Sequence, residues 1–167
     1  MKQTFLLQTI LIIASFLIVI PKISSYNFTG ISIYDTDYQK LERNTVIHWL
    51  NFEELENKLQ TTPKPILIDA YTNWCGWCKR MDATTFKDEQ VGKILTDSYY
   101  AVKLNAEGEA NIRFDGKVFK EYELAKQLGV RGFPTVILIN PETNQSKILT
   151  GYQKASPLSK QLVKFMK

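Results

Sequence analysis

Two cysteines separated by two residues stand where a buried strand is predicted to run into a helix. Residues 66–68 form a short apolar run, as expected of a strand buried on both faces. Residues 77–86 contain no glycine or proline, and this favours a helix. Because a helix N-terminus carries unpaired N–H groups and a positive dipole end, it stabilises a thiolate at Cys75. Cys78 lies one turn further on, so the pair is expected to act as a redox switch.

The chain has no cysteine other than Cys75 and Cys78, so a structural disulfide framework is excluded. A bridge across so few residues constrains little of the chain, and a hydrophobic content of 44% is sufficient for a core. Reactivity therefore explains the pair better than stability does. We expect no resident metal or cofactor, because two sulfurs and the single His48 are too few for structural zinc. Two thiolates can hold Cu(I), and this is the alternative from another class.

Residues 1–25 are predicted to be an export signal. Residues 4–20 carry no charged side chain and are followed by a proline and small residues, with cleavage expected after Ser25. The alternative is an uncleaved membrane anchor through residues 4–20, although about 17 residues is the lower limit for spanning a bilayer. Residues 26–45 are polar without a clear period, and we interpret them as a tether or an irregular lead-in to the domain. The following domain, residues 46–167, is expected to face an extracytoplasmic compartment.

The elements of this domain are predicted from capping signals and hydrophobic spacing. Helices are expected after Asn51, at the cysteine motif, after Asp88, from Phe119 and at Ser156–Pro157. Strands are expected over residues 46–50, 66–68, 100–104, 135–140 and 147–150, and residues 106–116 are predicted to be a polar loop. The resulting order, β-α-β-α-α-β-α-β-β-α, indicates an α/β fold in which a central mixed sheet has helices on both faces.

Several separate motifs of the chain resemble those of the thioredoxin superfamily. Residues 74–79, Trp-Cys-Gly-Trp-Cys-Lys, resemble the active-site signature of that family. Asp69 stands six residues before the first cysteine, as does the buried acid of thioredoxins, and residues 103–105 resemble the strand whose lysine neighbours that acid. Residues 130–135 are similar to the segment that carries the cis-proline of the family. Residues 85–91 resemble the C-terminal domain of the membrane electron carrier DsbD more than cytosolic thioredoxin.

The resemblance implies a thioredoxin fold and assigns the chemistry to four residues. Cys75 is expected to be the accessible nucleophile, whose thiolate attacks a partner disulfide, and Cys78 to resolve the mixed disulfide. Asp69 is expected to serve Cys78 as its acid–base group, because burial raises the pKa of a carboxyl group. The alternative is a structural acid paired with Lys103, and the two roles can coexist.

Five further residues are expected to bind the substrate. Pro134 is expected to follow a cis peptide that presents the backbone around Phe133 to an extended client segment. Trp77, which replaces the usual proline of the family, is expected to face outward and join Phe133 in an apolar patch. Trp74 flanks the nucleophile, although core packing is the stronger expectation for its ring. Gly76 is expected to keep the approach to the nucleophile open by its small size.

We predict an exported thiol–disulfide oxidoreductase that reduces disulfides of partner proteins and draws on an upstream electron donor. An oxidase or isomerase of the same fold is the nearest alternative, and a Cu(I)-binding or redox-inert client-binding module is the alternative from another class. Removing residues 1–25 leaves 19 basic residues against 17 acidic ones, a balance too mild to indicate nucleic acid. A monomer in the bacterial periplasm is expected, with a secreted or membrane-anchored protein as the alternatives.

Overall fold

The computed structural model describes residues 46–167, so the predicted signal or anchor and the tether lie outside the described residues. The central sheet consists of β1 (Trp49–Leu50), β2 (Ile66–Tyr71), β3 (Tyr100–Asn105), β6 (Thr135–Asn140) and β7 (Gln145–Thr150). The strands lie in the order β1-β3-β2-β6-β7. β3 is parallel to β1 and β2, whereas β6 is antiparallel to β2 and β7. The sheet is therefore mixed, as predicted.

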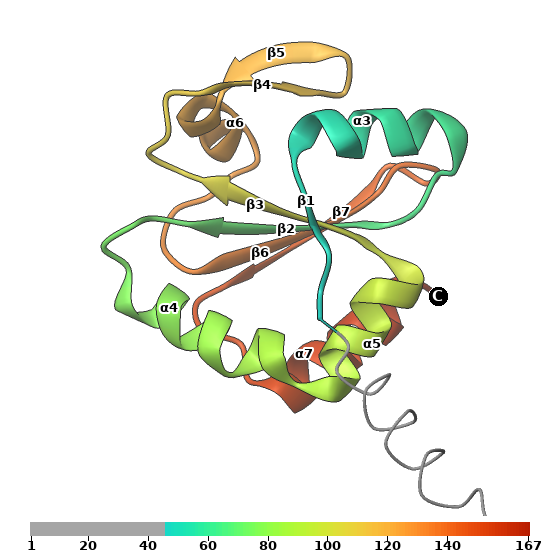
Figure 1. Ribbon diagram of the computed structural model, residues 1–167, viewed down its shortest axis with the longest axis vertical. Coiled ribbons are helices and arrows are strands. Elements are labelled where there is room, and N and C mark those ends of the chain that lie inside the picture. The colour runs from blue at the N-terminus through green and yellow to red at the C-terminus, as the bar shows by residue number, and fades with distance from the viewer. Residues whose placement is uncertain (1–45) are drawn as a thin grey trace, which may run out of the picture. The chain divides into compact units, whose positions relative to one another are not determined.

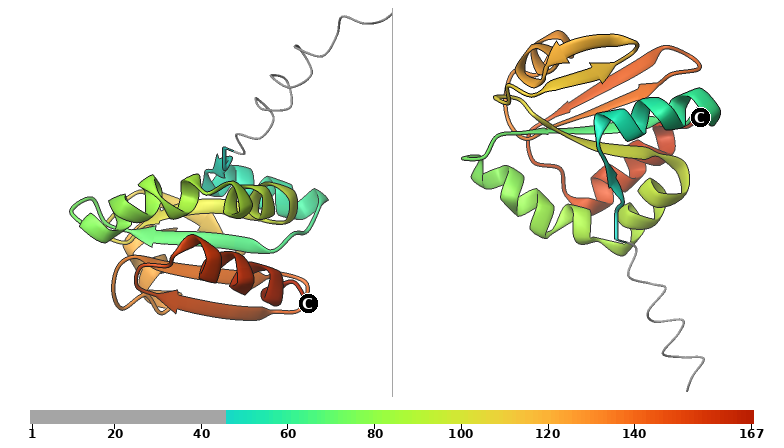
Figure 2. Two further views of the ribbon diagram at one scale, coloured as in Figure 1. Left: turned by 90° about the horizontal axis from the view of Figure 1, so that it is seen from below. Right: turned by 45° about the horizontal axis from the view of Figure 1, so that its top comes forward.

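Helices cover both faces of this sheet, which confirms the predicted fold class (Figure 1). The helices on one face are α3 (Phe52–Thr61) and α6 (Glu121–Gln127). Those on the other face are α4 (Gly76–Ala83), the 3-10 helix η1 (Thr85–Lys87), α5 (Glu89–Ser98) and α7 (Ala155–Phe165). Figure 2 shows the same division from two further directions. Between residues 46 and 167, no helix has the length and apolar character needed to cross a lipid bilayer.

Alternate residues of β2 point to opposite faces of the sheet and fill two separate cores. Leu67 belongs to the core under α4, α5 and α7, whereas Ile66, Ile68 and Ala70 belong to the core under α3 and α6. Because side chains alternate along a strand, Asp69 lies on the same face as Leu67. The acid is therefore directed toward the face of the sheet that carries α4.

The predicted caps of α3 and α5 are present. The Asn51 side chain accepts a hydrogen bond from the Glu54 N–H (2.8 Å), and the Asn51 N–H donates to the Glu54 carboxylate (2.9 Å). The Asp88 side chain accepts from the Val91 N–H at 3.0 Å. These bonds satisfy helix N–H groups that have no intrahelical partner, so the local sequence determines where both helices begin.

The prediction of a polar loop over residues 106–116 is wrong. β4 (Asn111–Phe114) and β5 (Lys117–Lys120) form a two-stranded antiparallel hairpin. Asp115 and Gly116, at its turn, have φ of 52° and 71°, and Asp-Gly favours tight turns with positive φ at both central residues. Phe114 packs edge-on against Phe52 of α3, with ring centroids 6.1 Å apart. The hairpin is therefore attached to the α3 side of the domain.

Three predicted boundaries are also wrong. Phe119 belongs to β5, so α6 begins two residues later at Glu121. α7 begins at Ala155 with Lys154 as its cap, because a proline in the first turn of a helix needs no intrahelical N–H bond. The first strand is limited to Trp49–Leu50, the two residues that pair with β3.

Candidate functional site

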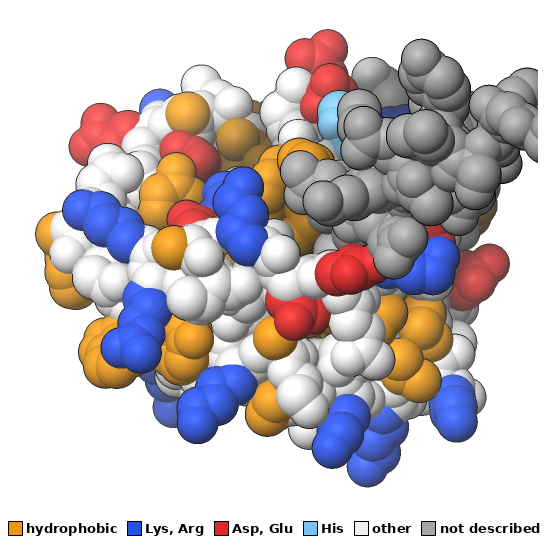
Figure 3. Space-filling model, turned by 60° about the horizontal axis from the view of Figure 1, so that its bottom comes forward, with side chains coloured by type: hydrophobic (Ala, Val, Ile, Leu, Met, Phe, Trp, Pro, Cys, Tyr) orange, Lys and Arg blue, Asp and Glu red, His pale blue; other side chains and the backbone are white. Residues whose placement is uncertain are grey.

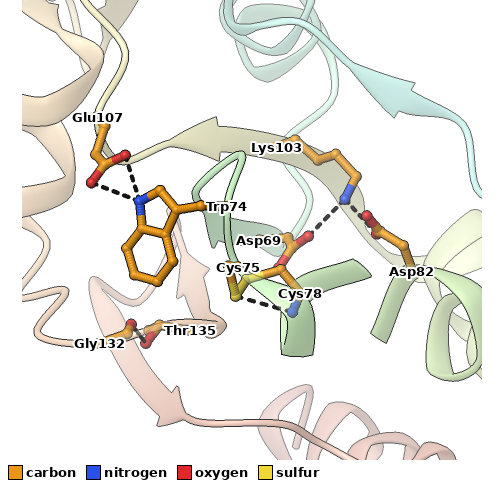
Figure 4. The surroundings of a disulfide bond; sticks show 9 residues. All are labelled: Asp69, Trp74, Cys75, Cys78, Asp82, Lys103, Glu107, Gly132 and Thr135. Atoms are coloured by element: carbon orange, nitrogen blue, oxygen red, sulfur yellow. Dashed lines mark hydrogen bonds and ion pairs between the residues drawn. A yellow bond between two sulfur atoms is a disulfide. The ribbon is translucent and has the colours of Figure 1, made fainter. Parts of the chain in front are cut away.

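Cys75 and Cys78 form a disulfide where β2 leads into α4 (Figure 4). Their Cα atoms are 5.3 Å apart. Cys75 is the N-cap of α4, and its sulfur accepts a hydrogen bond from the Cys78 N–H at 3.1 Å. The N–H of Cys75 donates to the Thr72 carbonyl at 3.2 Å. The same helix end is placed to stabilise negative charge on the Cys75 sulfur when the disulfide opens.

The disulfide is less accessible than the sequence predicts, since Cys75 and Cys78 are each 4% exposed. Gly76 lies beside it, and a Cβ built on that residue would meet no atom within 4 Å. The space over the Gly76 backbone is therefore uncrowded.

A buried acid lies on the same face of the sheet as α4. Asp69 is 2% exposed, and its carboxylate accepts a hydrogen bond from the Lys103 ammonium at 2.8 Å. The β2–β3 register places these two residues opposite each other. Lys103 also contacts the carboxylate of Asp82 on α4, at 2.5 Å. Figure 4 shows Lys103 reaching both carboxylates next to the disulfide.

Burial sets the protonation of this cluster. It raises the pKa of Asp69 above the ordinary carboxyl value, and Lys103 opposes that rise without cancelling it. Burial alone would lower the pKa of Lys103, but the carboxylates of Asp69 and Asp82 raise it. Burial thus favours the neutral form of Asp69, and the two carboxylates favour the charged form of Lys103. The second carboxylate oxygen of Asp69 and the hydroxyl of Thr72 are buried without a hydrogen-bond partner in the described part of the chain.

Three aromatic rings surround the Lys103 ammonium. Its nitrogen lies 4.6 Å from the ring centroid of Trp49, 5.4 Å from that of Tyr71 and 5.6 Å from that of Phe86. These distances are within the range of cation–π attraction. The rings hold the lysine between its two carboxylates.

One expectation for each tryptophan is wrong. Trp74 is not packed in the core: it is 67% exposed and packs edge-on against Phe133, with centroids 5.9 Å apart. The Glu107 carboxylate fixes this ring by accepting from its indole N–H at 2.9 Å and 3.1 Å. Trp77 does face outward, at 55% exposed, but it packs on Tyr152 rather than on Phe133.

The Phe133–Pro134 peptide bond is cis, as predicted. Two hydrogen bonds of 2.8 Å fix the backbone around this peptide bond. The Thr135 hydroxyl donates to the Gly132 carbonyl. The Gly151 N–H donates to the Pro134 carbonyl. The pairing of β6 with β2 brings Phe133 to the end of the sheet that carries the disulfide.

Within residues 46–167, no three His, Cys, Asp or Glu side chains come together as potential metal ligands. This finding does not bear on the Cu(I) alternative, which needs two thiolates. His48 is exposed and precedes β1.

The sequence reasoning missed Asp82, Trp49 and Glu107. A signal for Asp82 was available, since it lies four residues after Cys78 and therefore on the same side of α4. No local pattern indicated Trp49 or Glu107, because they come from other strands or loops and reach the site only through tertiary packing.

The fold, the disulfide at the start of α4 and the buried acid behind it together define a thiol–disulfide oxidoreductase of the thioredoxin class. The chain belongs to the thioredoxin-like domain family, which it matches over residues 52–166.

Comparisons with individual proteins support the same assignment. The thiol:disulfide interchange protein DsbD of Escherichia coli (strain K12) is 34% identical over 114 residues, which is 66% of this chain and 18% of that protein. DsbD of Campylobacter jejuni (strain RM1221) is 30% identical over 112 residues, covering 67% of this chain and again 18% of that protein. This chain thus spans less than a fifth of the length of these relatives.

Solved structures show the same fold. The solution structure of a thioredoxin from Thermus thermophilus has a TM-score of 0.57 at 18% identity, covering 72% of this chain and 88% of that one. A structure described as DsbH oxidoreductase has a TM-score of 0.55 at 22% identity, covering 71% of this chain and 85% of that one.

Proposed function

We propose that this protein is an exported reductase that transfers electrons from the Cys75–Cys78 dithiol to disulfides of partner proteins. The observation that carries the proposal is the disulfide at the N-terminus of α4, where the Cys78 N–H donates to the Cys75 sulfur. A thiolate at that sulfur would keep this hydrogen bond and the favourable helix dipole.

The reaction proceeds by two exchanges. The Cys75 thiolate attacks one sulfur of the partner disulfide, which forms a mixed disulfide and releases one partner thiolate. Cys78 then loses its proton, and its thiolate attacks the Cys75 sulfur. The Cys75–Cys78 disulfide forms, and the second partner thiolate leaves and takes up a proton. Two electrons pass to the partner, so a dithiol donor upstream must reduce the protein again.

Asp69 is the proposed acid–base group for Cys78. Its position on the face of β2 that carries α4, its raised pKa and its unpartnered oxygen all support proton exchange with a neighbouring thiol. Lys103 is the proposed positioning residue, because its hydrogen bond leaves one carboxylate oxygen free.

The client segment is proposed to lie across the end of the sheet over Gly76. The exposed ring of Trp74 packs on the partly buried ring of Phe133 on one side of the disulfide, and Pro134 supports the backbone beside it. Trp77 supplies exposed apolar surface on the other side. An extended peptide could hydrogen-bond to backbone groups there while its side chains contact these rings.

We infer an extracytoplasmic location, with the periplasm as the compartment and a monomer as the active form. The inference is supported by the leader pattern of residues 1–25 and by the similarity to proteins named thiol:disulfide interchange protein. Cleavage after Ser25 predicts a protein that is absent from the membrane fraction and lacks the mass of residues 1–25. Anchoring through residues 4–20 predicts a membrane-bound protein that retains this mass.

Trapping of covalent intermediates tests the proposed function. Replacement Cys78→Ser should accumulate mixed disulfides between Cys75 and client proteins, because the resolving thiol is missing. The matched control, Cys75→Ser, should trap far less, since its remaining cysteine is not the nucleophile. Equal trapping by both variants would contradict the assigned roles. Stoichiometric Cu(I) binding that both substitutions abolish, with no trapping by either, would favour the metal-binding alternative.

A further inference from the structure

An arginine lies over two aromatic rings beside the disulfide. We define the arginine platform as Trp77, Arg80 and Tyr152. The guanidinium carbon of Arg80 lies 5.3 Å from the Trp77 ring centroid and 5.8 Å from that of Tyr152. The two rings contact each other with centroids 5.5 Å apart. A guanidinium that stacks on rings keeps its N–H groups free at its edge.

Hydrogen bonds hold the tyrosine of the platform against the end of α4. The Tyr152 hydroxyl lies 2.9 Å from the Thr84 hydroxyl, which in turn bonds to the Arg80 carbonyl at 2.7 Å. The residues at the C-terminal end of α4 are therefore tied to the segment that follows β7. A preorganised side chain loses less conformational entropy on binding than a mobile one does.

The charge of Arg80 is not neutralised within the domain. Among residues 46–167, the ion pairs are those of Lys93 with Asp97 and of Lys103 with Asp69 and Asp82, and none involves Arg80. Arg80 is exposed. Figure 3 shows Lys and Arg side chains interspersed with exposed hydrophobic side chains over the face that carries α4, α5 and α7.

The opposite side of the disulfide carries the opposite charge. Glu107 follows β3, Cys75 follows β2, and Tyr152 follows β7. Because the order of these strands is β3-β2-β6-β7, the disulfide lies between Glu107 and the arginine platform. The Glu107 carboxylate accepts from the Trp74 indole, whereas Arg80 has no ion-pair partner among residues 46–167. A client segment that crosses the disulfide therefore meets a carboxylate that already has a partner on one side. On the other side it meets an arginine that has no ion pair in the described residues.

We propose that the arginine platform selects client segments that carry an Asp or Glu carboxylate close to the cysteine under attack. The carboxylate would accept hydrogen bonds from the guanidinium edge, a geometry in which arginine binds carboxylates in pairs of bonds. Apolar parts of the same segment would lie on Trp77 and Tyr152. This inference rests on the proposed reductase function and adds a client preference to it.

Three model peptides test the preference. Each contains one disulfide, and the residues next to one of its cysteines are Glu, Gln or Lys. Second-order rate constants for their reduction by the dithiol protein are divided by those for dithiothreitol, a small dithiol that also attacks as its thiolate, to remove differences in intrinsic reactivity. We expect the Glu peptide to react about 2- to 5-fold faster than the Gln peptide, as for an exposed ion pair. The Lys peptide should be slower than the Gln peptide, and both differences should shrink at 1 M salt.

Matched variants assign the preference to the platform. Arg80→Gln should bring the Glu-to-Gln ratio close to 1, and Arg80→Glu should invert it. Lys79→Gln removes the same charge from the neighbouring exposed position of α4, and it should retain the ratio because Lys79 contacts neither ring in the described residues. Cooperative thermal unfolding of each variant checks that the fold is kept.

The outcomes separate the two proposals. Equal corrected rates for all three peptides, with normal reduction of the Gln peptide, would overturn the client preference and leave the reductase proposal in place. Loss of the preference in Lys79→Gln to the same extent as in Arg80→Gln would also overturn it, because general charge would then explain the effect. Failure to reduce any peptide would instead overturn the reductase proposal.

Discussion

The Lys103 ammonium lies 2.8 Å from the buried carboxylate of Asp69, and strand pairing places the two residues opposite each other. The contact joins β2, which leads to the disulfide, to β3, which leads to Glu107. Asp82 adds a third charge from α4. The position of this charged cluster is therefore fixed by the pairing of β2 with β3 and by α4.

Replacement Asp69→Asn should stabilise the oxidised protein at neutral pH. The pKa of Asp69 is raised in the folded state, so the folded carboxyl holds its proton more tightly than the unfolded one. Stability is then lost as pH rises from the ordinary carboxyl pKa of about 3.9 through the raised value. The gain from the substitution should be full above that window and should vanish at lower pH, as measured by urea unfolding across pH.

Two controls accompany this variant. Asp97→Asn, at an exposed carboxylate, should change the unfolding free energy by less than about 0.5 kcal/mol at any pH. Asp69→Asn should also slow client reduction, by up to about 100-fold, because Cys78 loses its proton acceptor. A variant that is less stable than the original at neutral pH would contradict the account of Asp69.

Replacement Trp49→Leu should destabilise the protein by about 1–3 kcal/mol, because it removes a ring from the Lys103 cluster and leaves a cavity. Trp49 also packs edge-on against Phe86, with centroids 5.0 Å apart. Trp49→Phe retains an aromatic face and should cost less. Denaturant unfolding compares the two variants, and equal losses would indicate that the ring face does not contribute.

Replacement Glu56→Ala should loosen the β4–β5 hairpin without affecting the disulfide. The Glu56 carboxylate accepts from the N–H groups of Asp115 (2.8 Å) and Gly116 (3.3 Å). Its loss should cost about 1 kcal/mol locally and should speed hydrogen exchange over residues 111–120. Glu53→Ala, on the same helix, is the matched control. Unchanged exchange in the hairpin would show that Glu56 does not hold it.

Replacement Gly76→Val should slow client reduction by about 10- to 100-fold, because it displaces the partner sulfur from Cys75. Stability should change by less than about 0.5 kcal/mol, since a Cβ at this position meets no atom within 4 Å. Peptide reduction kinetics and thermal unfolding measure the two effects. Normal kinetics would mean that clients do not approach over the Gly76 backbone.

The sequence was sufficient where the signal was local. The apolar run of β2, the cap at Asp88 and the cysteine pair are each defined by neighbouring residues. The Asp115–Gly116 turn was also a local signal, but the polar composition around it favoured a loop. Two helix starts were misplaced because one residue fitted two positions. Phe119 suits the apolar face of a helix as well as the strand β5, and Pro157 suits the first position of a helix as well as a later position of its first turn.

Side-chain placement in the site could not be predicted in the same way. The direction of Trp74 depends on Glu107 and Phe133, which lie more than thirty residues away in sequence. Likewise, the stacking of Trp77 requires Tyr152, which follows β7. Such contacts are set by the order of strands in the sheet, and a sequence pattern does not contain that order.

An equilibrium redox titration of the Cys75–Cys78 couple against a thiol–disulfide buffer tests the central claim most directly. The account predicts one reversible two-electron transition with a midpoint below about −220 mV, close to reducing members of the class and well below the about −120 mV of a strong oxidant. A midpoint near that oxidising value, or no reversible transition, would contradict it.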